Sequence, residues 1–246
     1  MRPLITAIRT LTCIPIPGRD SSCLADALPF FPAVGLLIGL VVSGVLCLLS
    51  SHGWFAGAGI VAMIAAVWIT RALHVDGLAD VTDALGAGRT RERRLEIMKD
   101  PHTGAFGVTA ITGDLLLKTV ALTHLASLQQ WGLVIAPFII SRTAQVMLAV
   151  SLPYARPEGG KAGGFVEQAR PRHLVLAVTA ALAICLALSG LTGLLLLLQG
   201  LIATILLRIW MKREFGGVTG DLLGTGNEVI ETGLLAFAAF ISHATL

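Results

Sequence analysis

The stretch His74-Val-Asp-Gly-Leu-Ala-Asp-Val-Thr-Asp83 follows a run of apolar residues, 54–73, and carries three carboxylates. Asp76, Asp80 and Asp83 are spaced i, i+4 and i+7, so in a helix all three lie on one face. Three like charges one turn apart repel each other unless a cation lies among them. Hard oxygen ligands favour Mg²⁺, Mn²⁺ or Ca²⁺ over zinc. The stretch therefore predicts a divalent-metal site where a membrane helix meets water.

The composition is typical of a membrane protein. Of 246 residues, 55% are hydrophobic and 13% are charged, and the mean hydropathy is +0.82, whereas soluble domains are about 25% charged. Since a membrane-spanning helix needs about 20 residues, we expect an all-α, polytopic membrane helix bundle with about seven transmembrane helices. We expect a single catalytic domain over residues 1–246. The apolar segments are 30–50, 54–73, 105–127, 131–151, 173–189, 191–209 and 229–244. Only Ser189-Gly190 separates the fifth segment from the sixth, so one long helix or a re-entrant pair is the alternative there.

The basic residues fall at one end of such a bundle. Threading seven spans alternately gives the opposite end the turns without Lys or Arg, which are 51–53, 127–130 and 189–192. The basic end receives an N-terminal arm and three loop segments, which are 1–28, 89–99, 156–172 and 212–213. By the positive-inside rule, the basic end and the N-terminus are cytoplasmic. The net charge of +3 then serves topology, and no nucleic acid is needed to explain it.

A second group of acidic residues lies in the last cytoplasmic loop, 211–231. It contains Asp221, and Asn227, Glu228 and Glu231 would share a face at the start of the last helix. The two acidic groups lie on the same side of the membrane, where they could meet and complete one metal site. Basic residues beside them could bind phosphate. Acidic metal ligands and basic phosphate-binding groups are the parts of Mg²⁺-assisted phosphoryl transfer.

Three further charges lie inside apolar segments. Asp114 and Lys118 are four residues apart in the third segment, and Arg142 lies in the middle of the fourth. Charges inside a membrane are costly and are normally paired or face a cavity. Two interpretations stay open here. Asp114 could form a structural ion pair with Lys118 or Arg142, or these side chains could bind substrate.

Several phrases of the sequence, taken together, resemble the cobalamin synthase family, the adenosylcobinamide-GDP ribazoletransferases of bacterial and archaeal inner membranes. They are Leu73–Asp83, Ile97–Asp100 with Gly104-Ala-Phe-Gly107, Gly220–Gly224 with Asn227, Glu228 and Glu231, and the N-terminal Leu11–Pro17 and Phe30–Gly35. The resemblance runs nearly end to end, in matching order. Two stretches depart from the pattern. An arginine is expected at 102 or 103, where this chain has His and Thr, and small residues are commoner at 83–85.

The resemblance implies that adenosylcobinamide-GDP reacts with α-ribazole, or its 5′-phosphate, to give adenosylcobalamin, or its phosphate, and GMP. It implies Mg²⁺ as cofactor and an active site on the cytoplasmic face of the inner membrane. The metal ligands would be Asp76, Asp80, Asp221, Glu228 and Glu231. The catalytic residues would be Asp83 as the base, with Asp80, Lys99 and Arg142. The substrate-binding residues would be His74, Asp100, Asp114, Lys118 and Asn227. Besides the lipid bilayer, the expected partners are other enzymes of cobalamin assembly and a second copy of this chain.

Two other functions compete with this interpretation. The CDP-alcohol phosphotransferases of lipid synthesis also place aspartates on membrane helices beside Mg²⁺. Their phrase DGxxAR is broken here, because Asp80 follows Asp76-Gly77-Leu78-Ala79, and no GxxxDxxxD follows. A transporter could use the charges inside the apolar segments as a pathway. The acidic residues gather at one membrane face, however, and no inverted repeat is visible.

Overall fold

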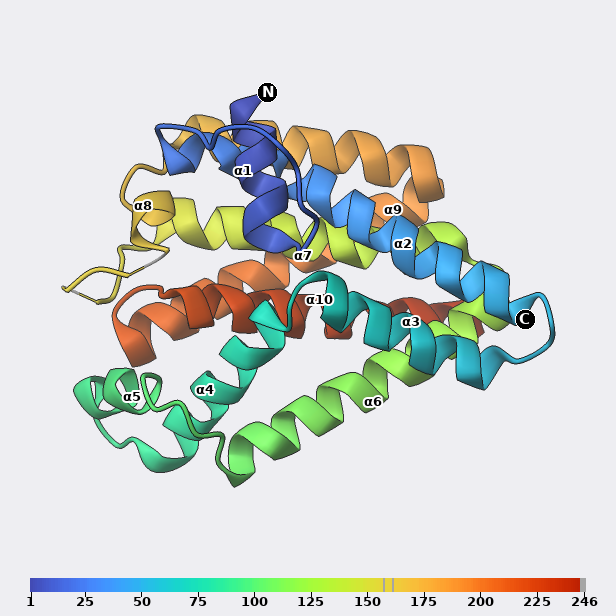
Figure 1. Cartoon of the computed structure of the whole chain (residues 1–246). Helices are drawn as coiled ribbons and strands as arrows, with labels where there is room; N and C mark the ends of the chain where they lie inside the picture. The colour runs from blue at the N-terminus through green and yellow to red at the C-terminus, as the bar shows by residue number, and fades with distance from the viewer. Residues whose placement is uncertain (157, 161, 244–246) are drawn as a thin grey trace.

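The structure, a computed structural model, describes residues 1–156, 158–160 and 162–243 (Figure 1). Over this part of the chain all regular elements are helical. They are α1 (Arg2–Leu11), the 3-10 helix η1 (Leu24–Phe30), α2 (Phe31–Ser50), α3 (Phe55–Ile69), α4 (Leu73–Ala87), α5 (Arg91–Ile97), α6 (Ala105–Ser127), α7 (Trp131–Ser151), α8 (Gly163–Val166), α9 (Pro171–Phe215) and α10 (Gly220–His243). An isolated β-bridge joins Tyr154 and Val218. The expected all-α membrane bundle is therefore confirmed.

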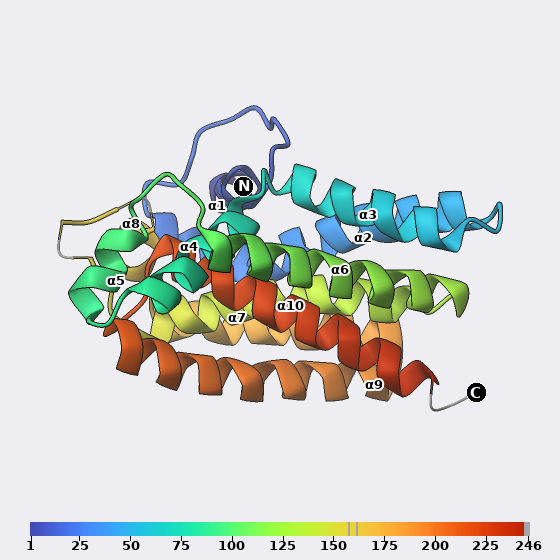
Figure 2. The same cartoon turned by 90° about the horizontal axis from the view of Figure 1, so that it is seen from below.

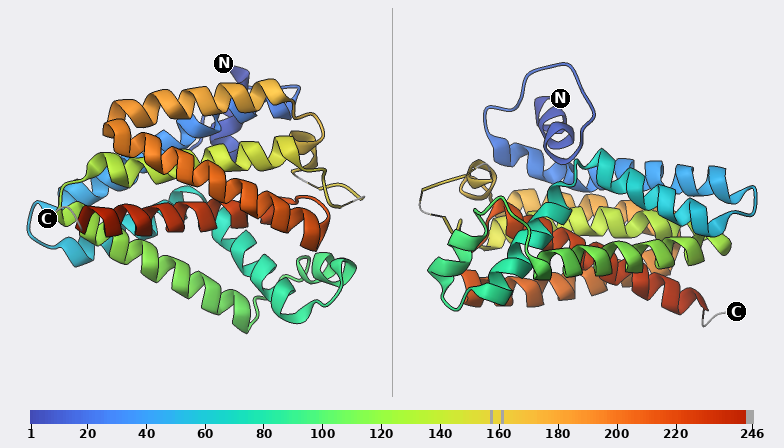
Figure 3. Two further views of the ribbon diagram at one scale, coloured as in Figure 1. Left: turned by 180° about the vertical axis from the view of Figure 1, so that it is seen from behind. Right: turned by 60° about the horizontal axis from the view of Figure 1, so that its bottom comes forward.

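Three of the seven apolar segments correspond directly to α2, α6 and α7. The fifth and sixth segments lie in α9, which is broken at Gly190, where φ is 55° and ψ is −133°. Because φ is positive there, glycine suits the break. Figure 3 shows that α9 reverses direction, so that its two halves run antiparallel. The break at Ser189-Gly190 is therefore confirmed and a single straight helix is wrong. That the two halves are two separate spans rather than a re-entrant pair stays a prediction.

The second and seventh segments differ from the expectation. Helix α3 ends at Ile69, and the chain then bends by 88° into α4. Helix α10 begins at Gly220, nine residues before the expected start at 229, and residue 244 lies outside the described residues. By length and hydropathy, four described helices can cross a membrane, or five if α3 and α4 count as one broken span. One of the four is the broken α9, and the total of about seven spans stays a prediction.

The two ends of the bundle differ in charge: one end holds turns without Lys or Arg, and the other end, which we call the polar end, holds charged segments. Figure 1 places the α2–α3 turn, the α6–α7 turn and the break in α9 at the same end. These are the turns without Lys or Arg. Helices α5 and α8 and the α9–α10 connection lie at the opposite end. The distribution of charge along the sequence therefore predicted correctly which of these turns and loops share an end, whereas α1 of the N-terminal arm lies along the side of the bundle. Helix α4 points from the bend toward the polar end, so its carboxylates lie outside the apolar segment 54–73.

Helix α7 forms the centre of the bundle. In its most apolar stretch 89% of the residues are buried, against 17% for α9, so α9 faces outward. Helix α7 packs against α2, α9 and α10. Figure 2 shows α3 and the second half of α9 on opposite sides, with α6, α7 and α10 between them. The central layer is also where the charged residues of the apolar segments are found.

The bend between α3 and α4 passes through two left-handed residues, neither of them glycine. The φ angles are 54° for Arg71 and 55° for Ala72. A left-handed conformation costs an L-residue about 1–2 kcal/mol. The Arg71 guanidinium donates to the Arg9 carbonyl at 2.8 Å, and the Ala72 amide donates to the Val67 carbonyl at 2.8 Å. These contacts help to hold the bend that directs α4 away from α3.

Helices α4 and α10 cross in close contact at Gly77. A Cβ atom at this position would lie 2.6 Å from the Asp221 carbonyl oxygen. The Thr225 hydroxyl donates to the Gly77 carbonyl at 2.9 Å across the same crossing. The glycine of the Asp76-Gly77 phrase therefore lets α4 approach the first turn of α10, and so brings Asp221 to the carboxylates of α4.

We expect Gly77→Ala to lower both stability and activity. The added Cβ would overlap backbone rather than a flexible side chain, and overpacking of this kind costs about 1–3 kcal/mol. Thermal unfolding in detergent measures the loss. Gly113→Ala is the matched control, because a Cβ atom there meets nothing within 4 Å. Equal unfolding temperatures for the two variants would contradict the close crossing.

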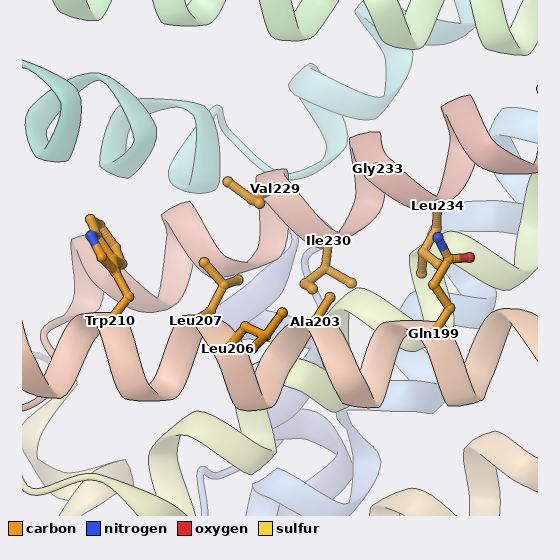
Figure 4. Close-up of a pocket in the computed structure, with 9 residues that line it drawn as sticks. All are labelled: Gln199, Ala203, Leu206, Leu207, Trp210, Val229, Ile230, Gly233 and Leu234. Atoms are coloured by element: carbon orange, nitrogen blue, oxygen red, sulfur yellow. The ribbon is translucent and has the colours of Figure 1, made fainter.

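An apolar groove of about 430 Å³ lies between the second half of α9 and α10 (Figure 4). Its walls include Ala203, Leu207 and Trp210 of α9 and Ile230 and Gly233 of α10. None of the site residues predicted from the sequence lines it. Apart from the Gln199 amide and the indole N–H of Trp210, the lining is apolar, so this groove offers no charged group for phosphoryl transfer.

Candidate active site

A cluster of three carboxylates lies at the α4–α10 crossing, which we call the carboxylate cluster: Asp76, Asp80 and Asp221. Asp76 is exposed, and Asp80 and Asp221 are half-buried. Burial, followed by the negative charges of Asp76 and Asp221, raises the pKa of Asp80 to about 7. Burial also raises the pKa of Asp221, although Arg156 opposes this effect. Three mutually repelling carboxylates at the polar end of a membrane bundle are suited to binding a cation or to accepting a proton.

Arg156 is the basic residue beside this cluster. Its Nη2 atom lies 2.8 Å from Asp221 Oδ2, and its charge lowers the pKa of Asp80 against the effect of the carboxylates. The sequence patterns did not identify this residue. In the sequence, Arg156 is noted only as part of the basic segment 156–172. Its contact with Asp221 could not be predicted from spacing, because the two residues are 65 positions apart.

Asp83 lies on the same helix as the cluster but has a different partner. Its two carboxylate oxygens accept hydrogen bonds from the backbone amides of Gly104, at 2.6 Å, and Gly107, at 2.9 Å. Both amides belong to the start of α6, where backbone N–H groups have no partner within the helix. The geometry favours Asp83 as a residue that holds the start of α6. Its role as the catalytic base stays a prediction.

Lys99 and Asp100 are exposed in the connection from α5 to α6. Lys99 pairs with Glu158, and Asp100 accepts from the backbone amide of His102 at 3.0 Å and contacts its ring Nδ1 at 2.6 Å. These partners are loop residues rather than members of the carboxylate cluster. The structure therefore gives no contact that supports the predicted roles of Lys99 and Asp100, which stay predictions.

The charged residues of the apolar segments form a second, separate group, which we call the buried ion network: Asp114, Lys118, Arg142, Glu228 and Glu231. Lys118 Nζ lies 3.3 Å from Asp114 Oδ2 and 3.0 Å from Glu231 Oε1, and it also pairs with Glu228. Arg142 pairs with Glu231. All five side chains are buried. The network therefore ties α6, α7 and α10 together inside the bundle.

These contacts decide between the structural pairs that the sequence left open. The Asp114–Lys118 ion pair is present. The alternative pair of Asp114 with Arg142 is wrong, because Arg142 pairs with Glu231 and Asp114 accepts from the Thr232 hydroxyl. The pairing supports a structural role for these residues. A substrate-binding role for Asp114 and Lys118, and a catalytic role for Arg142, stay predictions.

His74 and Asn227 border the buried ion network. His74 Nε2 lies 3.0 Å from Gln145 Nε2, and Asn227 Nδ2 donates to Glu228 Oε1 at 3.1 Å. Among the described residues, His74 Nδ1, Asn227 Oδ1 and Arg142 Nε have no hydrogen-bond partner. A cavity of about 10 Å³ borders Lys118, Arg142 and the two glutamates. This volume is about that of one water molecule, so it is far too small for a substrate.

The predicted set of five metal ligands is thus divided between two places. Asp76, Asp80 and Asp221 belong to the carboxylate cluster, whereas Glu228 and Glu231 are neutralised by Lys118 and Arg142. Over the described part of the chain, no group of three or more His, Cys, Asp or Glu side chains is arranged to hold a metal ion. The expected meeting of the two acidic groups in one metal site is therefore not found, and the carboxylate cluster does not form a three-ligand metal site either. A metal-binding role for any of the five residues stays a prediction.

Several apolar helices, with carboxylates and an arginine gathered at one end, define a polytopic membrane protein. The model of the cobalamin-5-phosphate synthase family matches residues 3–239, and the chain belongs to this family. It is therefore a transmembrane transferase of cobalamin biosynthesis. No solved structure matches the chain.

Several curated relatives share one name, and each is similar to this chain over nearly its whole length. The adenosylcobinamide-GDP ribazoletransferase of Chlorobaculum tepidum is 42% identical over 243 residues, which cover 96% of this chain and 94% of the relative. The protein of that name from Chlorobium chlorochromatii is 40% identical, covering 97% and 96%. The one from Syntrophobacter fumaroxidans is 37% identical, covering 95% and 96%. The chain is thus similar to these transferases from end to end.

Proposed function

We propose that this chain joins α-ribazole, or its 5′-phosphate, to adenosylcobinamide-GDP at the α4–α10 crossing. The primary hydroxyl of the ribazole attacks the phosphorus nearer to cobinamide, the bond from that phosphorus to GMP breaks, and the hydroxyl proton passes to a carboxylate. The observation that carries the proposal is the carboxylate cluster beside Arg156 in a chain of this family. A diphosphate requires positive charge at its binding site. The attacking hydroxyl requires a group that accepts its proton.

The carboxylate cluster fits the proposed Mg²⁺. Asp76 and Asp80 are one turn apart on α4, and the backbone of Asp221 approaches α4 at Gly77, close enough for the charge of Asp221 to raise the pKa of Asp80. Mg²⁺ is usually held by one or two carboxylates together with substrate phosphates, so a complete protein cage is not required. A bound ion would relieve the repulsion that raises the pKa of Asp80. When bound, Mg²⁺ neutralises charge on the diphosphate and on the departing GMP.

The carboxylate cluster also suits the shape of the proposed substrate. It lies at the polar end of the bundle, where α5 and α8 and the α9–α10 connection gather. We assign this end to the cytoplasmic face of the inner membrane, because the basic segments lie there. A corrinoid is large and amphiphilic, so a site at this boundary lets its nucleotide reach the carboxylates while its macrocycle remains near the lipid.

Turnover by the purified protein in liposomes tests the proposal. Adenosylcobinamide-GDP, α-ribazole and Mg²⁺ are supplied, and GMP and cobalamin are followed by chromatography, with EDTA as control. We expect stoichiometric GMP and cobalamin that depend on the metal. Folded protein that forms neither product would refute the assigned reaction, and product formation unaffected by EDTA would refute the role of Mg²⁺.

The affinity for Mg²⁺ is expected to depend on pH. Because the pKa of Asp80 is raised to about 7, this carboxyl is mostly protonated below pH 7 and ionised above it. Only the ionised form binds the metal, so at low Mg²⁺ turnover rises as the pH increases from 6 to 8. Saturating Mg²⁺ shifts the midpoint to lower pH, because the metal competes with the proton. A midpoint that does not move with Mg²⁺ concentration would contradict this coupling.

A further inference from the structure

We infer that Arg156 binds the diphosphate of the substrate, and that it exchanges its carboxylate partner Asp221 for phosphate oxygens when the substrate arrives. This inference rests on the proposed function, because it concerns a substrate that carries a diphosphate. Arg156 lies outside both acidic groups and outside the phrases that resemble the family.

The backbone holds Arg156 beside the first turn of α10. The segment after α7 pairs with the segment before α10 through the β-bridge. The Ala155 amide donates to the Val218 carbonyl at 2.9 Å, and the Val218 amide donates to the Pro153 carbonyl at 2.9 Å. Arg156 comes two residues after Tyr154 of this bridge and Asp221 comes three residues after Val218, so the bridge brings the two side chains together.

The guanidinium of Arg156 is placed to change partners. The ion pair with Asp221 uses Nη2, while Nε is buried and has no hydrogen-bond partner among the described residues. The side chains of Arg156 and Asp221 are 15% and 25% exposed, so the pair lies at the edge of the solvent rather than within the core. A guanidinium can donate through two parallel N–H groups to a phosphate, and one of them would replace the contact with Asp221.

Charge opposes the exchange until a cation binds together with the substrate. The charged groups around Arg156 include Asp80, Asp221 and Glu158, and these carboxylates repel a diphosphate. Three other cations nearby already have partners, because Arg94 pairs with Glu214, Lys99 pairs with Glu158, and Arg91 donates to the Ala155 carbonyl. The partner of Arg156, in contrast, is itself a candidate metal ligand. A metal ion that binds Asp221 with the substrate would therefore release Arg156 for the phosphates.

A purely structural ion pair is the competing interpretation, in which Arg156 and Asp221 only fasten the segment after α7 to α10. The two interpretations predict opposite changes in the affinity for GDP when Asp221→Asn is tested in the absence of metal. If the partners exchange, removing the carboxylate frees Arg156 and removes a repelling charge. If the pair is structural, removing either member loosens the same contact and weakens the site.

Binding of GDP to the purified protein in EDTA tests this difference without turnover. Titration calorimetry is expected to show about 10- to 100-fold weaker binding for Arg156→Gln, the usual effect of losing a charge-assisted hydrogen bond. The Asp221→Asn variant is expected to bind GDP several-fold more tightly than the wild-type protein. Arg93→Gln is the matched control, because this exposed arginine pairs with Glu96 on its own helix. Weaker binding by Asp221→Asn, or unchanged binding by Arg156→Gln, would overturn the inference.

Kinetics with both substrates provides the second readout. Arg156→Gln is expected to raise KM for adenosylcobinamide-GDP about 10- to 100-fold and to change KM for α-ribazole much less, and Arg156→Lys should recover part of the loss. An equal rise in both KM values would indicate general loosening of the site and overturn the assignment. Failure of the proposed function is distinguishable from this result, because it would remove turnover from the unchanged protein while the GDP titrations could still be performed.

Discussion

Replacement of Asp80 with asparagine is expected to reduce turnover about 100- to 1,000-fold while leaving the protein folded. Asparagine has nearly the same shape but lacks the negative charge that a metal ion requires. The change also removes one of three mutually repelling carboxylates, the one whose pKa is raised to about 7, so stability should be equal or slightly higher. Product formation by purified protein, with thermal unfolding in the same detergent, measures both effects. Normal turnover in this variant would exclude the carboxylate cluster as the metal site.

Asp83→Asn provides an informative comparison on the same helix. Because Asp83 accepts from two backbone amides at the start of α6, we expect its loss to cost about 1 kcal/mol of stability. Most of the turnover should remain. If Asp83→Asn lost turnover as completely as Asp80→Asn without losing stability, Asp83 would be the catalytic base that the family resemblance implies.

Local sequence patterns predicted the carboxylates of α4 but not all of their partners. The spacing of Asp76, Asp80 and Asp83 correctly predicted one helical face, since this depends only on the helix period. The partners of Asp83 and Asp221 depend on contacts with residues 21 and 65 positions away. Such contacts arise from how helices cross, which spacing within one segment does not reveal.

Hydropathy located helices that carry at most two charges within an apolar segment, and it missed the first half of α10, where polar residues gather. Helices α2, α6 and α7 were found with nearly correct bounds. Helix α10 begins nine residues earlier than expected, because its polar first half lies inside the bundle, where Glu228 meets Lys118. A charge neutralised by a distant partner has the same hydropathy value as one in water. The bend at Arg71 likewise carries no sequence signal, because positive φ is unusual for such a residue.

Lys118→Met is expected to destabilise the protein more than Gly77→Ala or Asp83→Asn. It would leave Asp114, Glu228 and Glu231 buried with Arg142 as the remaining cation of the network. Breaking a buried ion pair by removing one partner costs about 3–5 kcal/mol, because an uncompensated charge remains. We expect a much lower unfolding temperature in detergent and a reduced yield of inserted protein. An unfolding temperature equal to that of the unchanged protein would show that the network contributes little to the fold.

The double variant Lys118→Met with Glu228→Gln separates a structural role of Lys118 from a role in substrate binding. Neutralising Glu228 removes one of the charges that Lys118 compensates, so part of the lost stability should return. If Lys118 only stabilises the bundle, turnover should return with stability, because the carboxylate cluster and Arg156 are unchanged. A double variant that is stable but inactive would instead show that substrate or metal reaches the buried ion network. The small cavity beside Lys118 would then have to open during the reaction, since its volume of about 10 Å³ admits no more than about one water molecule.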